Sequence, residues 1–96
     1  MANRSLPVPT LLVASTCGNL TRDVRQAFAD GEQGLSLDFS HNAYTDDAGR
    51  MALISLGRTA RAAGGPLVLR NPPQMLTNAL SLAGLSAVFL VEKDAA

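Results

Sequence analysis

The chain has few of the residues that mark several common classes of protein. It has 96 residues, with one cysteine, one histidine and no tryptophan. A lone cysteine, Cys17, cannot form a disulfide within the chain, which fits a reducing compartment. One histidine and one cysteine cannot supply a zinc site, and the pair Asp46 and Asp47 lacks the further carboxylates of a calcium site. We therefore predict neither a metal nor a cofactor.

Net charge and long apolar runs are also missing. Eight basic side chains balance eight acidic ones, so no overall field attracts nucleic acid. No window approaches the ~18 uninterrupted apolar residues of a membrane span. The start of the chain does not show the charged and then apolar pattern of a signal peptide. We expect a soluble, cytoplasmic protein with no nucleic-acid partner and no membrane insertion.

The length bounds the domain organisation. A chain of 96 residues can fold as one domain but has no room for a second, which excludes a two-domain enzyme. We expect an extended lead-in over residues 1–9, a single domain over 10–92 and a tail over 93–96. Only four residues are aromatic, so the core must be mostly aliphatic.

Short apolar runs predict four strands, at residues 10–15, 35–39, 66–69 and 88–91. The run Leu-Ser-Leu-Asp-Phe alternates, which puts Asp38 on the side opposite the three apolar residues. This alternation indicates a sheet with one face covered by helices and the other less covered. The lead-in could add a degenerate edge strand, although Pro7 and Pro9 argue against a full ladder.

Helical spacing predicts three crossover helices between these strands. The first would be capped by Asn19 or Thr21 and end at Gly31 and Gly34. Its apolar stripe consists of Leu20, Val24, Ala27 and Phe28.

The second and longest helix runs from Asp46 or Asp47 to about Ala63, with Gly64-Gly65 as its cap before Pro66. Its expected apolar face is formed by Met51, Ala52, Ser55, Leu56, Thr59 and Ala63, broadened by Leu53 and Ile54. Arg50, Gly57 and Arg61 fall largely on the other side.

The third helix is predicted over about Pro73 to Ala83, ending at Gly84. Its expected stripe is Met75, Leu76, Ala79, Leu80 and Ala83. Asn71 before Pro72 should be extended. Alternating strands and helices then predict an α/β layered fold with a mostly parallel sheet of about four strands.

Three segments together resemble the STAS domain, the fold of bacterial anti-sigma factor antagonists. They are the strand ending in Asp38, the loop and helix start Tyr-Thr-Asp-Asp-Ala-Gly at 44–49, and the helix end Leu-Ser-Leu-Ala-Gly-Leu at 80–85. The resemblance implies a non-enzymatic domain that docks a protein partner. It also implies two strands before the first helix, whereas this sequence has only one clear strand there, so the fold is expected to be shortened at the N-terminus.

The resemblance also implies where the partner docks. By position, the docking surface comprises Thr45, Asp46, Asp47, Gly49 and Arg50. The partner would be an anti-sigma factor or a serine kinase, in partner-switching regulation. Asp47 stands where the family usually has a phosphorylated Ser or Thr. It could mimic a permanently phosphorylated, non-binding state, or leave a docking surface that phosphorylation cannot switch.

Each of these residues also has a simpler explanation. Asp46 and Asp47 suit the first turn of a helix, where carboxylates meet free N–H groups. Thr45 could cap the helix or serve as a substitute phosphoacceptor. Gly49 could allow a close approach or helix-to-strand packing. Arg50 could belong to the docking surface or to a solvated face.

Three alternatives concern the whole chain. It could be an accessory STAS subunit of an ABC-type lipid transporter, with a transporter ATPase as partner, or a companion of polysaccharide-synthesis enzymes. An enzyme would need Cys17 or a serine beside His41, with Asp38 to orient it, but no catalytic signature is present, and we predict no enzyme. The strand over 85–91 could pair with a second copy to form a homodimer.

Overall fold

The computed structural model describes residues 4–32, 34–63, 67–82, 84 and 89–93. Four parallel strands form the main sheet in the order β1-β3-β5-β6, with bounds Arg4–Pro7, Leu35–Asp38, Leu67–Arg70 and Phe89–Glu92. A second, two-stranded parallel sheet pairs β2 (Leu11–Leu12) with β4 (Tyr44–Thr45). The helices are α1 (Cys17–Ala29), α2 (Asp47–Ala62) and α3 (Gln74–Leu82). This arrangement confirms the predicted α/β fold.

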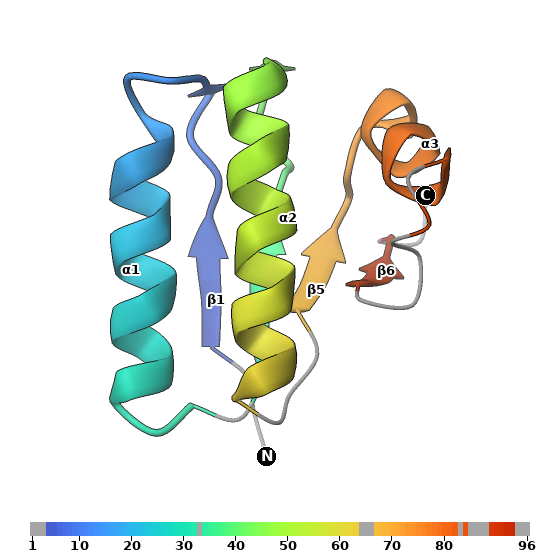
Figure 1. The fold of residues 1–96 in the computed structure, drawn as a ribbon. Helices are drawn as coiled ribbons and strands as arrows, with labels where there is room; N and C mark the ends of the chain where they lie inside the picture. Colours follow the sequence, from blue (N-terminus) through green and yellow to red (C-terminus); the bar gives the residue numbers. More distant parts are fainter. Residues whose placement is uncertain (1–3, 33, 64–66, 83, 85–88, 94–96) are drawn as a thin grey trace.

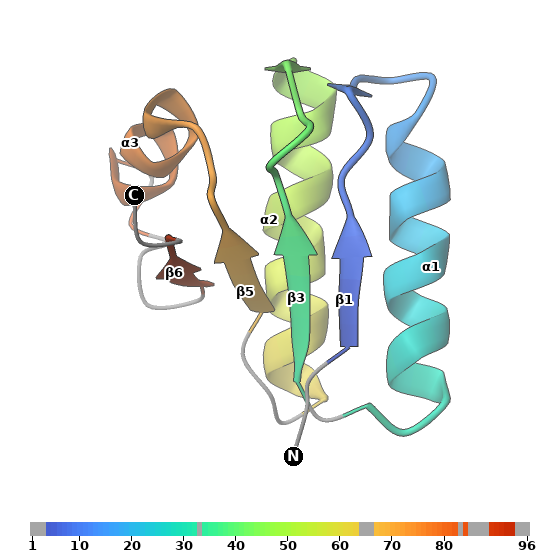
Figure 2. The ribbon, with the colours of Figure 1, turned by 180° about the vertical axis from the view of Figure 1, so that it is seen from behind.

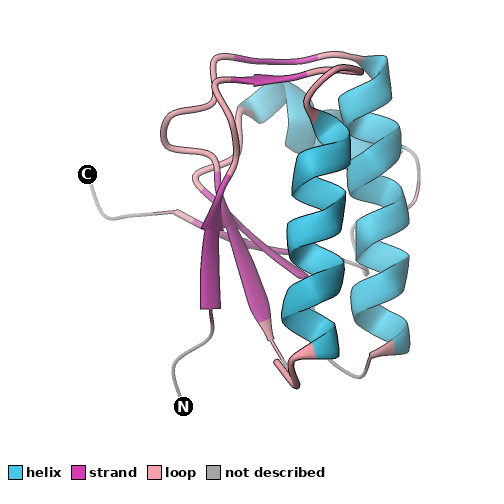
Figure 3. Cartoon of the chain, turned by 90° about the vertical axis from the view of Figure 1, so that its left-hand side faces the viewer, coloured by secondary structure: helices cyan, strands magenta, loops and turns pink. Residues whose placement is uncertain are grey.

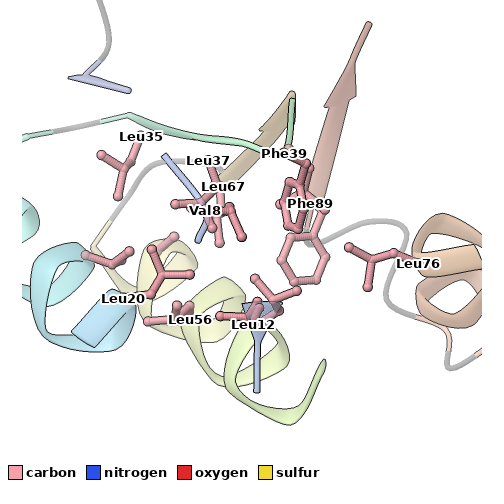
Figure 4. Packing of buried hydrophobic residues seen from close by; sticks show 14 of the residues in the cluster. Val8, Leu12, Leu20, Leu35, Leu37, Phe39, Leu56, Leu67, Leu76 and Phe89 are labelled. Atoms are coloured by element: carbon pink, nitrogen blue, oxygen red, sulfur yellow. The ribbon is translucent and has the colours of Figure 1, made fainter. Parts of the chain in front are cut away.

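Helices α1 and α2 lie side by side over one face of the main sheet (Figure 1). Seen from behind, strands β1, β3 and β5 stand in front of the helices, and none of the helices described lies on this face of the sheet (Figures 2 and 3). The core between the layers is largely aliphatic, as predicted. Leucines of β3, α2 and β5 are fully buried in it, and Leu76 of α3 points toward Phe89 of β6 (Figure 4).

The N-terminal strands differ from the prediction. The expected strand over 10–15 shortens to β2, which lies outside the main sheet and pairs with β4. The lead-in supplies β1, an edge strand of the main sheet whose ladder with β3 ends at Pro7. A proline is tolerated there because an edge strand leaves alternate N–H groups without a ladder partner. Two strands therefore precede α1, and the expected N-terminal shortening is wrong.

Helix α1 begins earlier than either predicted cap. Its N-cap is Thr16, whose side chain makes no cap hydrogen bond. The Thr16 hydroxyl instead donates to the carbonyl of Leu11 at 2.6 Å and accepts from the amide of Val13 at 2.9 Å. This turn starts the helix at Cys17, before Asn19 and Thr21. The predicted stripe is confirmed, with Phe28 partly buried.

Helix α2 buries a different face from the one predicted. Its buried residues are Gly49, Leu53, Leu56, Gly57 and Ala60. Met51 is exposed, although the apolar pattern placed it in the stripe. The buried face combines the small residues Gly49, Gly57 and Ala60 with two leucines, so it is not the face that carries the most apolar side chains.

Two predictions around α3 are also wrong. Asn71 is not extended but has a φ of 55°, and its amide donates to the Glu92 carbonyl at 2.7 Å. Asparagine is one of the few residues that tolerates this region. Met75 is exposed, whereas Leu76 and Leu80 are buried as expected. The predicted roles of Gly64-Gly65, Pro66, Ala83 and Val88 lie outside the described residues.

Candidate functional site

The loop between β3 and α2 is tied to the N-terminal segment by backbone hydrogen bonds. Ala43 N donates to the Thr10 carbonyl at 2.8 Å, and Asp46 N donates to the Leu12 carbonyl at 3.2 Å. Between these bonds, β4 runs parallel to β2, with Tyr44 beside Leu11. The start of α2 is therefore placed by a segment more than thirty residues earlier in the chain.

Asn42 holds this arrangement from inside the loop. Its side-chain amide donates to the carbonyl of Pro9 at 2.8 Å and is also within reach of the carbonyls of Thr10 and Tyr44, at 3.3 and 3.2 Å. Its carbonyl oxygen accepts from the Thr45 hydroxyl at 3.2 Å. One side chain thus joins both strands of the small sheet, a role that the sequence pattern did not indicate.

The helix cap is Asp46. Its carboxylate accepts from the amide of Gly49 at 2.8 Å, which satisfies one of the free N–H groups of the first turn. The predicted capping role of Thr45 is wrong, because its hydroxyl is used by Asn42. Asp46 is the cap because its backbone is extended, with a ψ of −174°, and its side-chain oxygen therefore reaches the amide of Gly49, the third residue of the helix.

Gly49 is required by a close approach rather than by the helix itself. A Cβ atom at this position would overlap the carbonyl oxygen of Leu12 and lie 2.9 Å from Cγ2 of Thr45. Leu12 is the second residue of β2, so the absence of a side chain at Gly49 lets α2 rest on the small sheet. Packing of the helix on a strand, one of the two explanations open from the sequence, is the one observed, and it brings the two backbones close together.

Asp47 does not cap the helix with its side chain but forms an ion pair with Arg50, three residues later. The Asp47 side chain is 87% exposed, and that of Arg50 is 40% exposed. Solvent screens such a pair strongly, so it adds little to stability. Its consequence is electrostatic, since the carboxylate and the guanidinium cancel each other on this surface.

A small pocket opens beside this ion pair. Its volume is about 110 Å³, and its lining includes Tyr44, Arg50, Met75 and Leu76. Tyr44 is 58% exposed and Met75 is 81% exposed, unusual values for side chains of this size. The sequence analysis missed the contribution of α3 to this site because it assigned Met75 to the core.

The residues weighed for catalysis have the following surroundings in the structure. Cys17 Sγ lies 3.7 Å from the Ala14 carbonyl, and His41 is exposed in the turn after β3. Asp38 Oδ1 accepts from the Ser40 hydroxyl at 2.6 Å and from the Ser40 amide at 2.9 Å. These bonds hold the pKa of Asp38 below its ordinary value, helped by the positive charge of Arg70.

Across the described ranges, no three His, Cys, Asp or Glu side chains gather closely enough to hold a metal ion. None of the helices described has both the length and the apolar character needed to cross a membrane.

Comparisons with known proteins agree with the observed topology. The family model described as "Mlab, STAS domain" matches residues 7–92. A Thermotoga maritima protein described as an anti-sigma factor antagonist has a similar structure, with a TM-score of 0.75 and 17% identity over 95% of this chain and 80% of that one. The Bacillus cell fate determinant SpoIIAA in its phosphorylated form gives a TM-score of 0.73 and 16% identity over 91% and 79% of the two chains. A search of curated proteins finds no match.

Proposed function

The chain belongs to the STAS domain family, and we propose that it acts as a non-enzymatic binding domain of the anti-sigma factor antagonist type. In this proposal Thr45, Asp46, Asp47, Gly49 and Arg50 form the surface that docks an anti-sigma factor or a serine kinase. The family is generally non-enzymatic. The role belongs to partner switching in the control of bacterial transcription, and hence to the cytoplasm.

The observation that carries this proposal is the exposed apolar rim around the Asp47–Arg50 ion pair. Tyr44 of β4 and Met75 of α3 both line the pocket and are both exposed. Met51 is exposed one helical turn after Asp47 and so lies on the same side of α2. Tyrosine, methionine and arginine are enriched at protein interfaces. Exposed together, they favour a docking surface over a solvated face.

Asp47 supports the version of this proposal in which the chain behaves as if it were permanently phosphorylated. A carboxylate carries one negative charge where a phosphate would carry roughly 1.5 to 2. In this chain the charge is directed to Arg50 within the same helix turn. We propose that Asp47 thereby keeps the surface in the state that a phosphorylated residue would impose, in which it docks the kinase or anti-sigma factor only weakly.

The test compares three forms of the chain as bait in cytoplasm from the native organism, with retained proteins identified by mass spectrometry. The forms are the native chain, Asp47→Ser and Asp47→Asn. Asparagine keeps the shape of aspartate but removes its charge, so it separates electrostatics from size. We expect Asp47→Ser and Asp47→Asn to retain a serine kinase or anti-sigma factor that the native chain retains weakly.

Two other results would contradict the proposal in different ways. Equal retention by all three forms would show that Asp47 does not act as a switch and would leave it as a residue of the first helix turn. Retention of a transporter ATPase by all three forms, with no kinase or anti-sigma factor, would overturn the antagonist role itself.

A further inference from the structure

The two edges of the main sheet are unlike each other. At one edge, β1 ends in Pro7. Arg4 of this strand forms an ion pair with Asp30, which follows helix α1, at 3.9 Å between the guanidinium nitrogen and the carboxylate oxygen. At the other edge stands β6, which among the described residues pairs only with β5 (Figures 1 and 2). Its residues Leu90 and Val91 are 53% and 48% exposed. An apolar edge strand is a template for pairing with another chain, whereas proline and charge blunt an edge. In β6 the charge is confined to Glu92, its last residue.

The hydrogen bonds of β6 show which of its groups face outward. The Glu92 carbonyl accepts from Asn71 N, just past β5, so Glu92 directs its backbone groups toward β5. Successive residues of a strand direct these groups to opposite sides. Leu90 therefore also faces β5, while the N–H and C=O groups of Phe89 and Val91 point away from the sheet.

These outward groups restrict how a second copy can pair with β6. In an antiparallel pair, residues that exchange both hydrogen bonds must both face the partner strand. A two-fold axis through any of the four residues of β6 satisfies this condition. An axis through Phe89 leaves only Phe89 paired within β6, so the choice lies among axes through Leu90, Val91 and Glu92.

Charge and burial then select one of the three. An axis through Glu92 sets two carboxylates directly opposite each other, which is repulsive. An axis through Val91 sets Leu90 against Glu92 and so covers a carboxylate with an apolar side chain. An axis through Leu90 sets Leu90 against its own copy and Phe89 against Val91, so every pair formed within β6 is apolar, and Glu92 falls opposite residue 88, beyond the described strand.

We propose that this chain forms a two-fold dimer in which β6 pairs antiparallel with β6 of a second copy, with Leu90 on the axis. The Phe89 and Val91 pairs on either side of the axis exchange backbone hydrogen bonds. The two sheets become one eight-stranded sheet, twice the four strands of one copy. Because the axis is perpendicular to the sheet, α1 and α2 of both copies lie on the same face.

The first test is the mass in solution, measured by light scattering after gel filtration. We expect the native chain to have twice the 10.0 kDa of one copy. Leu90→Lys places two like charges opposite each other at the axis, and we expect its mass to fall by half. Leu82→Lys makes the same change at a residue that is 90% exposed on α3, outside the proposed interface, and we expect it to remain dimeric.

The second test fixes the register through oxidative crosslinking in a Cys17→Ser background. Cβ atoms of directly opposite residues lie about 4.5–5.5 Å apart, close to disulfide geometry. We expect Leu90→Cys to crosslink two copies, whereas Val91→Cys, which faces Phe89 instead of itself, should not. A native chain that is monomeric at high concentration overturns the dimer, and crosslinking through residue 91 rather than 90 overturns the register.

Discussion

Gly49 in α2 and Leu12 in β2 approach so closely that a Cβ atom on Gly49 would overlap the Leu12 carbonyl oxygen. The same carbonyl accepts from the amide of Asp46, the residue that caps α2. One backbone group of the N-terminal segment thus sets both the start of the helix and its distance from the small sheet. The proposed docking surface depends on that position.

Gly49→Ala should destabilise the protein by about 1–3 kcal/mol, the cost of overpacking a tight contact. Alanine is the better helix former by about 1 kcal/mol, so the sign of the change distinguishes the two effects. Chemical denaturation provides the measurement. Gly18→Ala is the matched control, because nothing lies within 4 Å of a Cβ atom there, and it should stabilise the protein. A neutral or stabilising Gly49→Ala would contradict the close approach.

Asp46→Ala should cost about 1 kcal/mol through loss of the cap bond to Gly49. Asp47→Ala should change stability by less than about 0.5 kcal/mol, because its ion pair with Arg50 is exposed. Thermal unfolding of the two variants makes the comparison. Equal losses of stability in the two variants, or a larger loss in Asp47→Ala, would contradict the assignment of Asp46 as the helix cap.

Asn42→Ala should destabilise the small sheet, because it removes the donor to Pro9 and the acceptor for Thr45. Leaving partly buried polar groups unpaired costs about 1–3 kcal/mol. Hydrogen exchange should show faster exchange at the amides of Ala43 and Asp46, which bond to the N-terminal segment. Exchange at the amides of β5 reports on the main sheet and serves as the reference. A uniform increase at both places would mean that Asn42 has no local role.

Ser40→Ala should raise the pKa of Asp38 toward its ordinary value, because the hydroxyl bond is the largest cause of the depression. A carboxyl group with a depressed pKa in the folded state stabilises the fold above the unfolded value of about 3.9. That stabilisation is lost as the pH falls through the lower folded value, so the variant should lose less stability in acid than the native chain.

An NMR titration of the Asp38 carboxyl group measures the pKa change directly. Ser55→Ala on α2 is the control, because Ser55 contributes its carbonyl rather than its hydroxyl to the hydrogen bond with Thr59. Ser55→Ala should leave the titration midpoint of the Asp38 carboxyl group unchanged. An identical midpoint in Ser40→Ala would contradict the assigned cause.

The local pattern of the sequence was sufficient for the elements with a strong signal. The runs at β3, β5 and β6 and the long helix α2 appear close to their predicted bounds. The apolar residues of β3 and β5, alternating or continuous, could be buried only between a sheet and its helices. The layered α/β fold followed from the order of these elements along the chain.

The local pattern was not sufficient to predict the two short N-terminal strands, β1 and β2. Residues 4–7 carry one apolar residue between polar ones and a proline, yet they pair with β3 because that strand offers a full row of backbone partners. The two residues of β2 are a strand only because β4 lies beside them. Pairing of this kind depends on distant segments, and a local pattern does not record it.

The sequence by itself determined the class of fold, the aliphatic core and the position of the candidate docking residues at the start of α2. Only the tertiary structure decided that Asp46 rather than Thr45 caps that helix, that Gly49 meets Leu12, and that Met75 joins Tyr44 at the pocket. Hydrophobic periodicity records which side chains need burial. It does not record which distant backbone supplies a hydrogen bond, or where a small residue is needed to let two elements touch.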